Sequence, residues 1–189
     1  NFDDTKAILD ELEQGVGFVA CNTLVIGLLH EALVAQGRAA LARLPAAERG
    51  TSALIDNLGR LLKKMGQLKE ARPLLEQAVQ AKREALGDGH PDTLVSVHNL
   101  GKLLGGMGQL EKAMPLLEEA MLVRRETLGN HHPLTLLSIY NMGWLLMDMG
   151  KLDESRPLHE EALQARRKTL GDRHTETLAS IVWMGRLLQ

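Results

Sequence analysis

Apolar residues in most of this chain recur every three or four positions, the spacing that places them on one face of an α-helix. In residues 93–107 they are Leu94, Val97, Leu100, Leu103 and Leu104. In residues 110–128 they are Leu110, Ala113, Leu117, Ala120 and Met121. The pattern predicts two amphipathic helices separated by a short turn.

The same pair of helices recurs along the chain. Residues 93–134 and 135–176 are identical at 21 of 42 positions when aligned with a shift of 42 residues. The register also extends backward and forward, which defines three full units and part of a fourth: 51–92, 93–134, 135–176 and 177–189. A fixed period of this kind predicts a repeat protein, in which each unit packs on its neighbours.

Glycine and proline recur at matching positions in the units. Glycines are expected to end the helices because they adopt left-handed backbone angles at little cost: Gly66, Gly87, Gly108, Gly129, Gly150 and Gly171. Prolines near the beginning of the second helices, where a missing N–H costs least, are Pro73, Pro115 and Pro157. A mid-helix glycine returns in all four units, which implies close packing there: Gly59, Gly101, Gly143 and Gly185.

These features resemble the tetratricopeptide repeat. The mid-helix glycines match the family's small residue at its eighth position. The family's second-helix alanines match Ala71 and Ala113, with Ser155 departing, and then Ala78, Ala120 and Ala162. The 42-residue period is longer than the common 34 and is similar to the kinesin light chain and nephrocystin-type subclass. The resemblance implies an all-α fold, a right-handed α-solenoid of antiparallel helix pairs over residues 51–189.

The first 50 residues do not fit the register. Residues 1–15 predict a short acidic amphipathic helix, and residues 17–44 predict a longer apolar helix ended by Pro45. Because terminal repeats need a covering unit, we expect residues 1–50 to cap the solenoid. The alternative is that they dock a partner or another domain. The apolar stretch 17–29 is too short for a membrane span.

Composition narrows the choice of function. The chain is 44% hydrophobic but 3% aromatic, and its net charge of −2 is too close to zero to predict attraction to nucleic acid or to a membrane. The single cysteine excludes an intrachain disulfide, so we expect the cytoplasm or another reducing compartment.

Candidate chemistry is sparse. His90, His132 and His174 lie one period apart, too far from each other to share a zinc ion, so we interpret them as turn residues that help to cap the following helix. His159 stands at a core position occupied by leucine in the other units. No nucleophile–base set and no phosphate-binding glycine loop emerge. We therefore predict a non-enzymatic protein without metal or cofactor.

The resemblance implies that the first helices line a concave groove that holds peptides. Residues between the apolar stripes, including Asp56 and Asp148, are expected to face it. The candidate peptide-binding residues among them are Asn57, Arg60, Lys63, Lys64, His98, Asn99, Lys102, Tyr140, Asn141, Trp144 and Arg186.

Two features of this set suggest a mechanism. Asparagines at the matching positions of kinesin light chains pair with cargo peptide backbones, a role that the resemblance carries to Asn57, Asn99 and Asn141. The alternative is that these amides bond to neighbouring helices. The excess of Lys and Arg favours acidic peptides, with Tyr140 and Trp144 as aromatic contacts, unless the charges form only a solvated face.

The sequence thus predicts a protein-interaction scaffold or adaptor that binds a peptide segment of a partner. The alternative is a structural subunit of a larger assembly, which contacts its neighbours through the N-terminal helices and the convex or end faces. A weaker hypothesis is a regulatory module within a longer enzyme or signalling chain.

Overall fold

In the computed structural model of this chain, the backbone is described for residues 18–187 and the side chains for residues 23 and 25–185. The predicted helix over residues 1–15 lies outside the described residues. The elements are α2 (Phe18–Arg43), α3 (Ala46–Arg49), α4 (Ala53–Lys64), α5 (Leu68–Leu86), α6 (Pro91–Gly106), α7 (Leu110–Leu128), α8 (Pro133–Asp148), α9 (Leu152–Leu170) and α10 (Thr175–Leu187). No strand occurs in residues 18–187, so the all-α prediction is confirmed.

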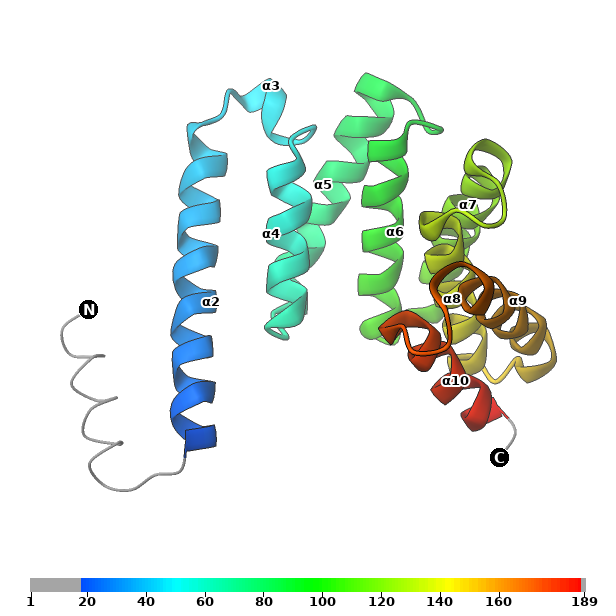
Figure 1. The fold of residues 1–189 in the computed structure, drawn as a ribbon. Coiled ribbons are helices and arrows are strands. Elements are labelled where there is room, and N and C mark those ends of the chain that lie inside the picture. Colours follow the sequence, from blue (N-terminus) through cyan, green and yellow to red (C-terminus); the bar gives the residue numbers. More distant parts are fainter. Residues whose placement is uncertain (1–17, 188–189) are drawn as a thin grey trace.

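The helices form a two-layered, curved array (Figure 1). Three pairs, α4 with α5, α6 with α7 and α8 with α9, follow one another, and α10 packs on α9 as the first helix of a further pair. The first helices α4, α6 and α8 also contact one another in sequence. They form one layer, and the second helices α5, α7 and α9 form the other.

The helix ends follow the predicted signals. Each first helix is followed by a glycine with a positive φ, which is 76° at Gly66, 73° at Gly108 and 75° at Gly150. The second helices end at glycines with φ of 83° to 89° and ψ near 164°, a region that essentially only glycine enters: Gly87, Gly129 and Gly171. The recurring glycines are therefore required by backbone conformation.

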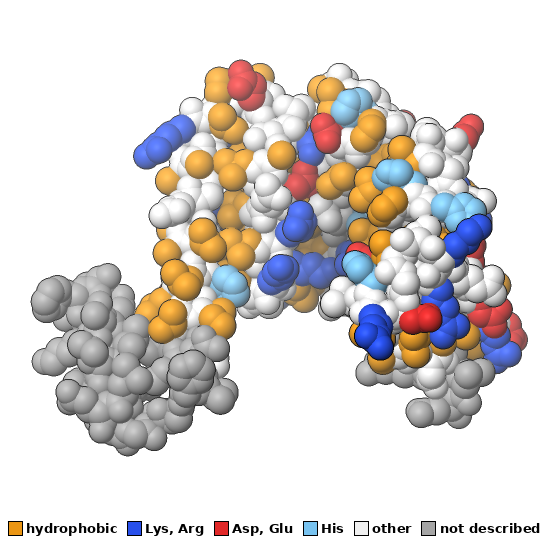
Figure 2. Space-filling model, viewed as in Figure 1, with side chains coloured by type: hydrophobic (Ala, Val, Ile, Leu, Met, Phe, Trp, Pro, Cys, Tyr) orange, Lys and Arg blue, Asp and Glu red, His pale blue; other side chains and the backbone are white. Residues whose placement is uncertain are grey.

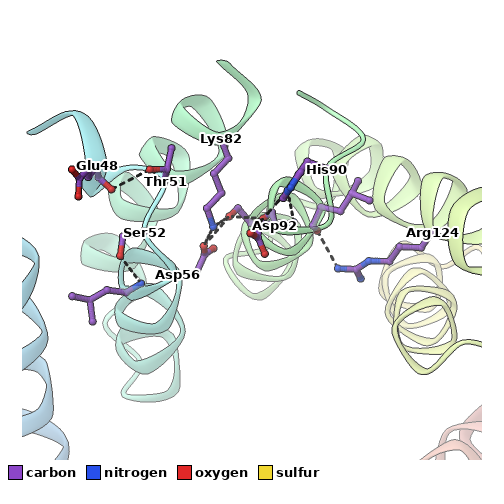
Figure 3. Close-up of polar contacts among 11 residues, drawn as sticks. Glu48, Thr51, Ser52, Asp56, Lys82, His90, Asp92 and Arg124 are labelled. Carbon is purple, nitrogen blue, oxygen red and sulfur yellow. Dashed lines mark hydrogen bonds and ion pairs between the residues drawn. The ribbon is translucent and has the colours of Figure 1, made fainter. Parts of the chain in front are cut away.

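The histidines of the inter-repeat turns cap the next helix, as predicted. His90 Nδ1 accepts a hydrogen bond from the backbone N–H of Asp92 at 3.2 Å (Figure 3). His132 and His174 make the equivalent bonds at 3.2 and 3.3 Å. Each ring satisfies an N–H that the first turn of a helix leaves without an internal partner.

The prolines of the second helices lie where the sequence places them, but beyond the first turn. Pro115 is the sixth residue of α7, which begins at Leu110, and Pro73 and Pro157 hold the same place in α5 and α9. At that depth an ordinary residue would donate to the carbonyl four residues earlier. Each proline therefore removes one internal hydrogen bond, so its missing N–H is not at the first-turn position where it costs least.

The mid-helix glycines accept a large side chain from the paired helix. A Cβ added to Gly59 would lie 2.7 Å from Leu75, and one added to Gly101 would lie 2.9 Å from Leu117. In the third unit the neighbour of Gly143 is the His159 ring, which is fully buried. The inferred packing reason is confirmed for Gly59, Gly101 and Gly143, and His159 takes the predicted core position. A Cβ added to Gly185 meets no described atom within 4 Å.

Helix α2 agrees closely with the predicted helix over residues 17–44. It packs on α4 but keeps an exposed apolar row of Val25, Ile26, Leu29 and Leu33. By length and composition alone, its segment Val25–Arg43 is long and apolar enough to cross a membrane. The apolar stretch 17–29, noted in the sequence, is too short to do so.

Candidate peptide-binding surface and its basic pocket

Part of the predicted binding set converges on one pocket. Arg60, Lys63 and Lys64 project from one side of α4, and Asn99 and Lys102 project from α6. The spacings of three and four residues bring the side chains of each helix together. With Leu75 they line a cavity of about 260 Å³. Figure 2 shows Lys and Arg side chains gathered in the hollow over α4 and α6.

The cations of this basic pocket crowd one another. Lys63 Nζ donates a hydrogen bond to the backbone carbonyl of Lys102 at 2.9 Å, which ties α4 to α6. Burial and the nearby Lys102 charge lower the pKa of Lys63 to about 8. Burial and the Arg60 charge also lower the pKa of Lys102. The protein holds several like charges here at an energetic cost.

The pocket also lacks internal counter-charges. Among the described residues, no carboxylate forms an ion pair with Arg60, Lys63, Lys64 or Lys102. The side-chain amide nitrogen of Asn99 is buried and has no hydrogen-bond acceptor among those residues. Buried donors without acceptors are uncommon and costly, and Asn99 is one of the residues that line the pocket.

The three predicted asparagines do not share one environment. Asn57 is exposed on α4, Asn99 is half-buried in the basic pocket and Asn141 is buried. The Asn141 amide donates to the Leu137 carbonyl at 2.7 Å and lies 3.2 Å from His98 Nε2 of the preceding first helix. For Asn141 the structure therefore shows the bonding to a neighbouring helix that the alternative interpretation predicts.

Asp56 does not face the groove as the sequence suggested. It is buried, and its carboxylate pairs with Lys82 of α5 (Figure 3). Ser96 Oγ of α6 donates to the same carboxylate at 2.8 Å, and Lys82 Nζ also donates to Ser96 at 3.0 Å. A buried carboxylate is tolerable because a cation from the second helix neutralises it.

His98 occupies the equivalent position in the next unit and is also buried rather than exposed. Burial and the positive charges of Arg124, Lys102 and Lys63 lower its pKa to about 3, so the ring is neutral at physiological pH. Arg124 from α7 donates to Ser138 Oγ at 2.7 Å and to the Leu94 carbonyl at 3.2 Å. His98 thus belongs to the polar core between units.

The aromatic candidates pack between helices. Tyr140 meets the His159 ring edge-on with centroids 5.6 Å apart, and the Arg166 guanidinium lies 4.8 Å from the Tyr140 ring centre. Trp144 of α8 packs against Gly105 of α6. Both aromatic side chains remain half-exposed. The side chain of Arg186 lies outside the described ones.

Sequence reasoning missed the polar pairs Asp56 with Lys82, His98 with Arg124 and Tyr140 with Arg166. A signal was present, because the first pair is separated by 26 residues and the same separation recurs one and two periods later. Spacing alone did not show that the two positions face each other across each helix pair.

A two-layered solenoid of helix pairs with polar residues on its first-helix layer defines a class of repeat scaffolds. The tetratricopeptide repeat matches residues 51–122, 97–147 and 135–176. Because these matches cover most of the chain, it belongs to the tetratricopeptide repeat family. A comparison with curated proteins finds no match.

Solved structures agree with this assignment. The nearly identical TPR-like repeats of a protein assigned as a kinesin light chain in Podosopora anserina are 27% identical, with a TM-score of 0.65, over 99% of this chain and 84% of that one. A single-substitution variant of those repeats is 28% identical, with a TM-score of 0.66, and the match again covers 99% of this chain and 84% of that one. BtubC (BKLC) from P. vanneervenii shares the fold, with a TM-score of 0.71 at 16% identity, over 98% and 80% of the chains. The repeats are therefore of the kinesin light chain-like type.

Proposed function

We propose that this protein is a non-enzymatic interaction scaffold that binds a peptide segment of a partner protein along the layer formed by α4, α6 and α8. The family supports a role in protein interaction. The observation that carries the narrower proposal is the basic pocket. Among the described residues its Asn99 amide nitrogen has no acceptor and its four cations have no carboxylate partner.

The charge of this surface favours acidic segments. Arg60, Lys63, Lys64 and Lys102 contribute positive charge, and Asp56 is neutralised internally by Lys82. Complementary charges speed association and select partners. We expect the affinity for an acidic peptide to exceed that for a basic peptide of equal length and to fall as salt is added. Equal affinity for both at every salt concentration would contradict this preference.

The groove can be tested with Asn99→Asp. This change replaces an amide donor with a carboxylate that can pair with the neighbouring cations, so partner capture should fall. The measurement is affinity capture with quantitative mass spectrometry, followed by dissociation constants for captured peptides. Glu118→Gln is the matched control because Glu118 is exposed on α7, whereas the adjacent Glu119 pairs with Arg83. Unchanged capture by Asn99→Asp would contradict groove binding.

The second candidate function is a structural subunit of a larger assembly. The exposed apolar row on α2, formed by Val25, Ile26, Leu29 and Leu33, is the observation that favours it. In that case Leu29→Asp with Leu33→Asp should abolish co-purification with stable partners, while Asn99→Asp should not. The reducing compartment expected from the single cysteine remains a prediction under either function.

A further inference from the structure

The basic pocket has the composition of an anion site rather than of a general peptide surface. Four cationic side chains from two helices reach one cavity of about 260 Å³: Arg60, Lys63, Lys64 and Lys102. Cavities that enclose whole small ligands commonly measure roughly 300–1,000 Å³. The size of this one therefore suits a single charged group carried by a longer molecule.

Hydrogen-bond donors converge on the same place. Lys63 uses one of its three N–H bonds for the Lys102 carbonyl, which leaves two. The Arg60 guanidinium offers up to five N–H donors, and the buried Asn99 amide nitrogen has no acceptor among the described residues. A carboxylate supplies two oxygens for these donors, whereas a phosphate monoester supplies three together with a charge near −2.

Charge favours the same ligand. The pKa of Lys63 falls to about 8 and that of Lys102 also falls, because both are partly buried and surrounded by like charge. Among the described residues, no carboxylate within ion-pair distance relieves this repulsion. A dianion offsets more of it than a monoanion does.

We propose that the pocket formed by Arg60, Lys63, Lys64, Asn99 and Lys102 binds the dianionic phosphate group of a phosphorylated side chain in a peptide partner. The peptide source rests on the proposed function, since the pocket opens on the layer of first helices where a peptide would lie. Phosphorylation of that peptide then controls its binding.

The experiment compares three peptides that differ at one residue: Gly-Gly-phosphoserine-Gly-Gly, its serine form and its glutamate form, all with blocked ends. Inorganic phosphate is the fourth probe. Calorimetry at low salt should give saturable binding of the phosphopeptide at least about tenfold tighter than the glutamate peptide, a ratio worth about 1.4 kcal/mol. The serine peptide should not bind. Equal affinity for the phosphoserine and glutamate peptides would overturn the proposal.

Variants locate the site. The double variant Lys63→Gln/Lys102→Gln removes two crowded charges and should abolish the phosphate-dependent gain. Its control is Lys112→Gln, which removes one charge from an exposed position on α7 and should leave binding unchanged. Circular dichroism establishes that both variants fold. Arg60→Gln, at an exposed position, tests the same pocket if the double variant unfolds. Retained discrimination in folded pocket variants would contradict the assignment.

A second readout follows the pocket directly. Phosphate binding should raise the pKa of Lys63 above about 8, measured by NMR titration of its Cε carbon, because the anion favours the charged lysine. An unchanged Lys63 titration at saturating phosphopeptide would overturn the site.

The outcomes separate this inference from the groove function. If inorganic phosphate binds as tightly as the phosphopeptide, the pocket is a site for free phosphate, and the proposal that a peptide carries the phosphate is overturned. Partner capture that is lost in Asn99→Asp but survives phosphatase treatment of the partner would support the groove and overturn the phosphate site. Phosphopeptide binding without any Asn99-dependent capture of unphosphorylated partners would support the phosphate site alone.

Discussion

At the scale of single residues, one position of the first helix holds a different residue in each full unit: Asp56, His98 and Tyr140. In every full unit this residue faces a basic side chain from the second helix. Asp56 meets Lys82 as a buried ion pair. His98 lies near Arg124 as a neutral ring, and Tyr140 receives the Arg166 guanidinium over its face. Each arrangement avoids placing two like charges together in the interior. The chain therefore keeps the basic residue and varies its companion.

His98 makes folding stability sensitive to acid. Its pKa is about 3 in the folded state, under Arg124, Lys102 and Lys63, against an ordinary value of 6.5. Between these values the unfolded chain binds the additional proton, so the free energy of unfolding falls as pH drops from about 6.5 towards 3. Asn141 supplies only a neutral contact to the ring.

We expect His98→Gln to flatten this pH dependence by up to about 1.4 kcal/mol per pH unit, because glutamine does not titrate. The measurement is urea unfolding between pH 7 and pH 4. His131→Gln is the control because that side chain is exposed and remains in water after folding. If the free energy of unfolding of His98→Gln changed with pH as steeply as that of the wild-type protein, protonation of this ring would not limit stability.

At the scale of elements, the glycines let paired helices approach closely. Leu117 of α7 is fully buried against Gly101 of α6, where no side chain intervenes. The same contact recurs between Leu75 and Gly59. At Gly185 of α10 no described atom lies within 4 Å of an added Cβ, because the described chain has no second helix after α10.

This contrast predicts opposite effects of one substitution at equivalent positions. Gly101→Ala should lower the free energy of unfolding by about 1–3 kcal/mol, because its methyl group overlaps Leu117 and the packed core gives way poorly. Gly185→Ala should be neutral or stabilise by up to about 1 kcal/mol, because alanine favours helix and its methyl group meets no described atom. Thermal and urea unfolding of both variants measures the difference. Equal effects would contradict the packing explanation.

At the scale of the whole molecule, each helix pair packs on the pairs beside it. Among the described residues, the principal helix contact of α2 is with α4 and that of α10 is with α9, whereas α6 and α8 are packed on both sides. Ion pairs between successive second helices, such as Arg83 with Glu119 and Arg125 with Glu161, add links on the outer layer. The free energy of unfolding of such an array is close to the sum of the stability of each repeat and the energies of the interfaces between adjacent repeats.

We therefore expect amide hydrogen exchange to be slowest in α6, α7 and α8 and fastest in α2 and α10, since end helices open without breaking two interfaces. Exchange measured by mass spectrometry should show this gradient. Partner binding at the basic pocket should slow exchange in α4 and α6 before it affects α9. Uniform protection from α2 to α10 would indicate a single cooperative unit instead.

The sequence alone determined the secondary structure and the fold class. Periodic apolar residues, turn glycines and the 42-residue repeat predicted α6 and α7 to within two residues at each end and the capping role of His90. The turn glycines and the helix cap act locally, and the apolar pattern recurs with a fixed period of 42 residues. Their physical consequences therefore do not depend on distant parts of the chain.

Only the tertiary structure decided which polar side chains are available to a partner. Asp56, His98 and Asn141 have groove-like positions in the helical pattern, yet each is buried because a residue of a neighbouring helix reaches it. The sequence places Arg60, Lys63, Lys64 and Lys102 on the groove face but leaves open a merely solvated charge face. In the structure α4 and α6 bring them into one pocket with Asn99. Helical periodicity assigns a residue to a face, whereas its accessibility depends on the helices packed beside that face.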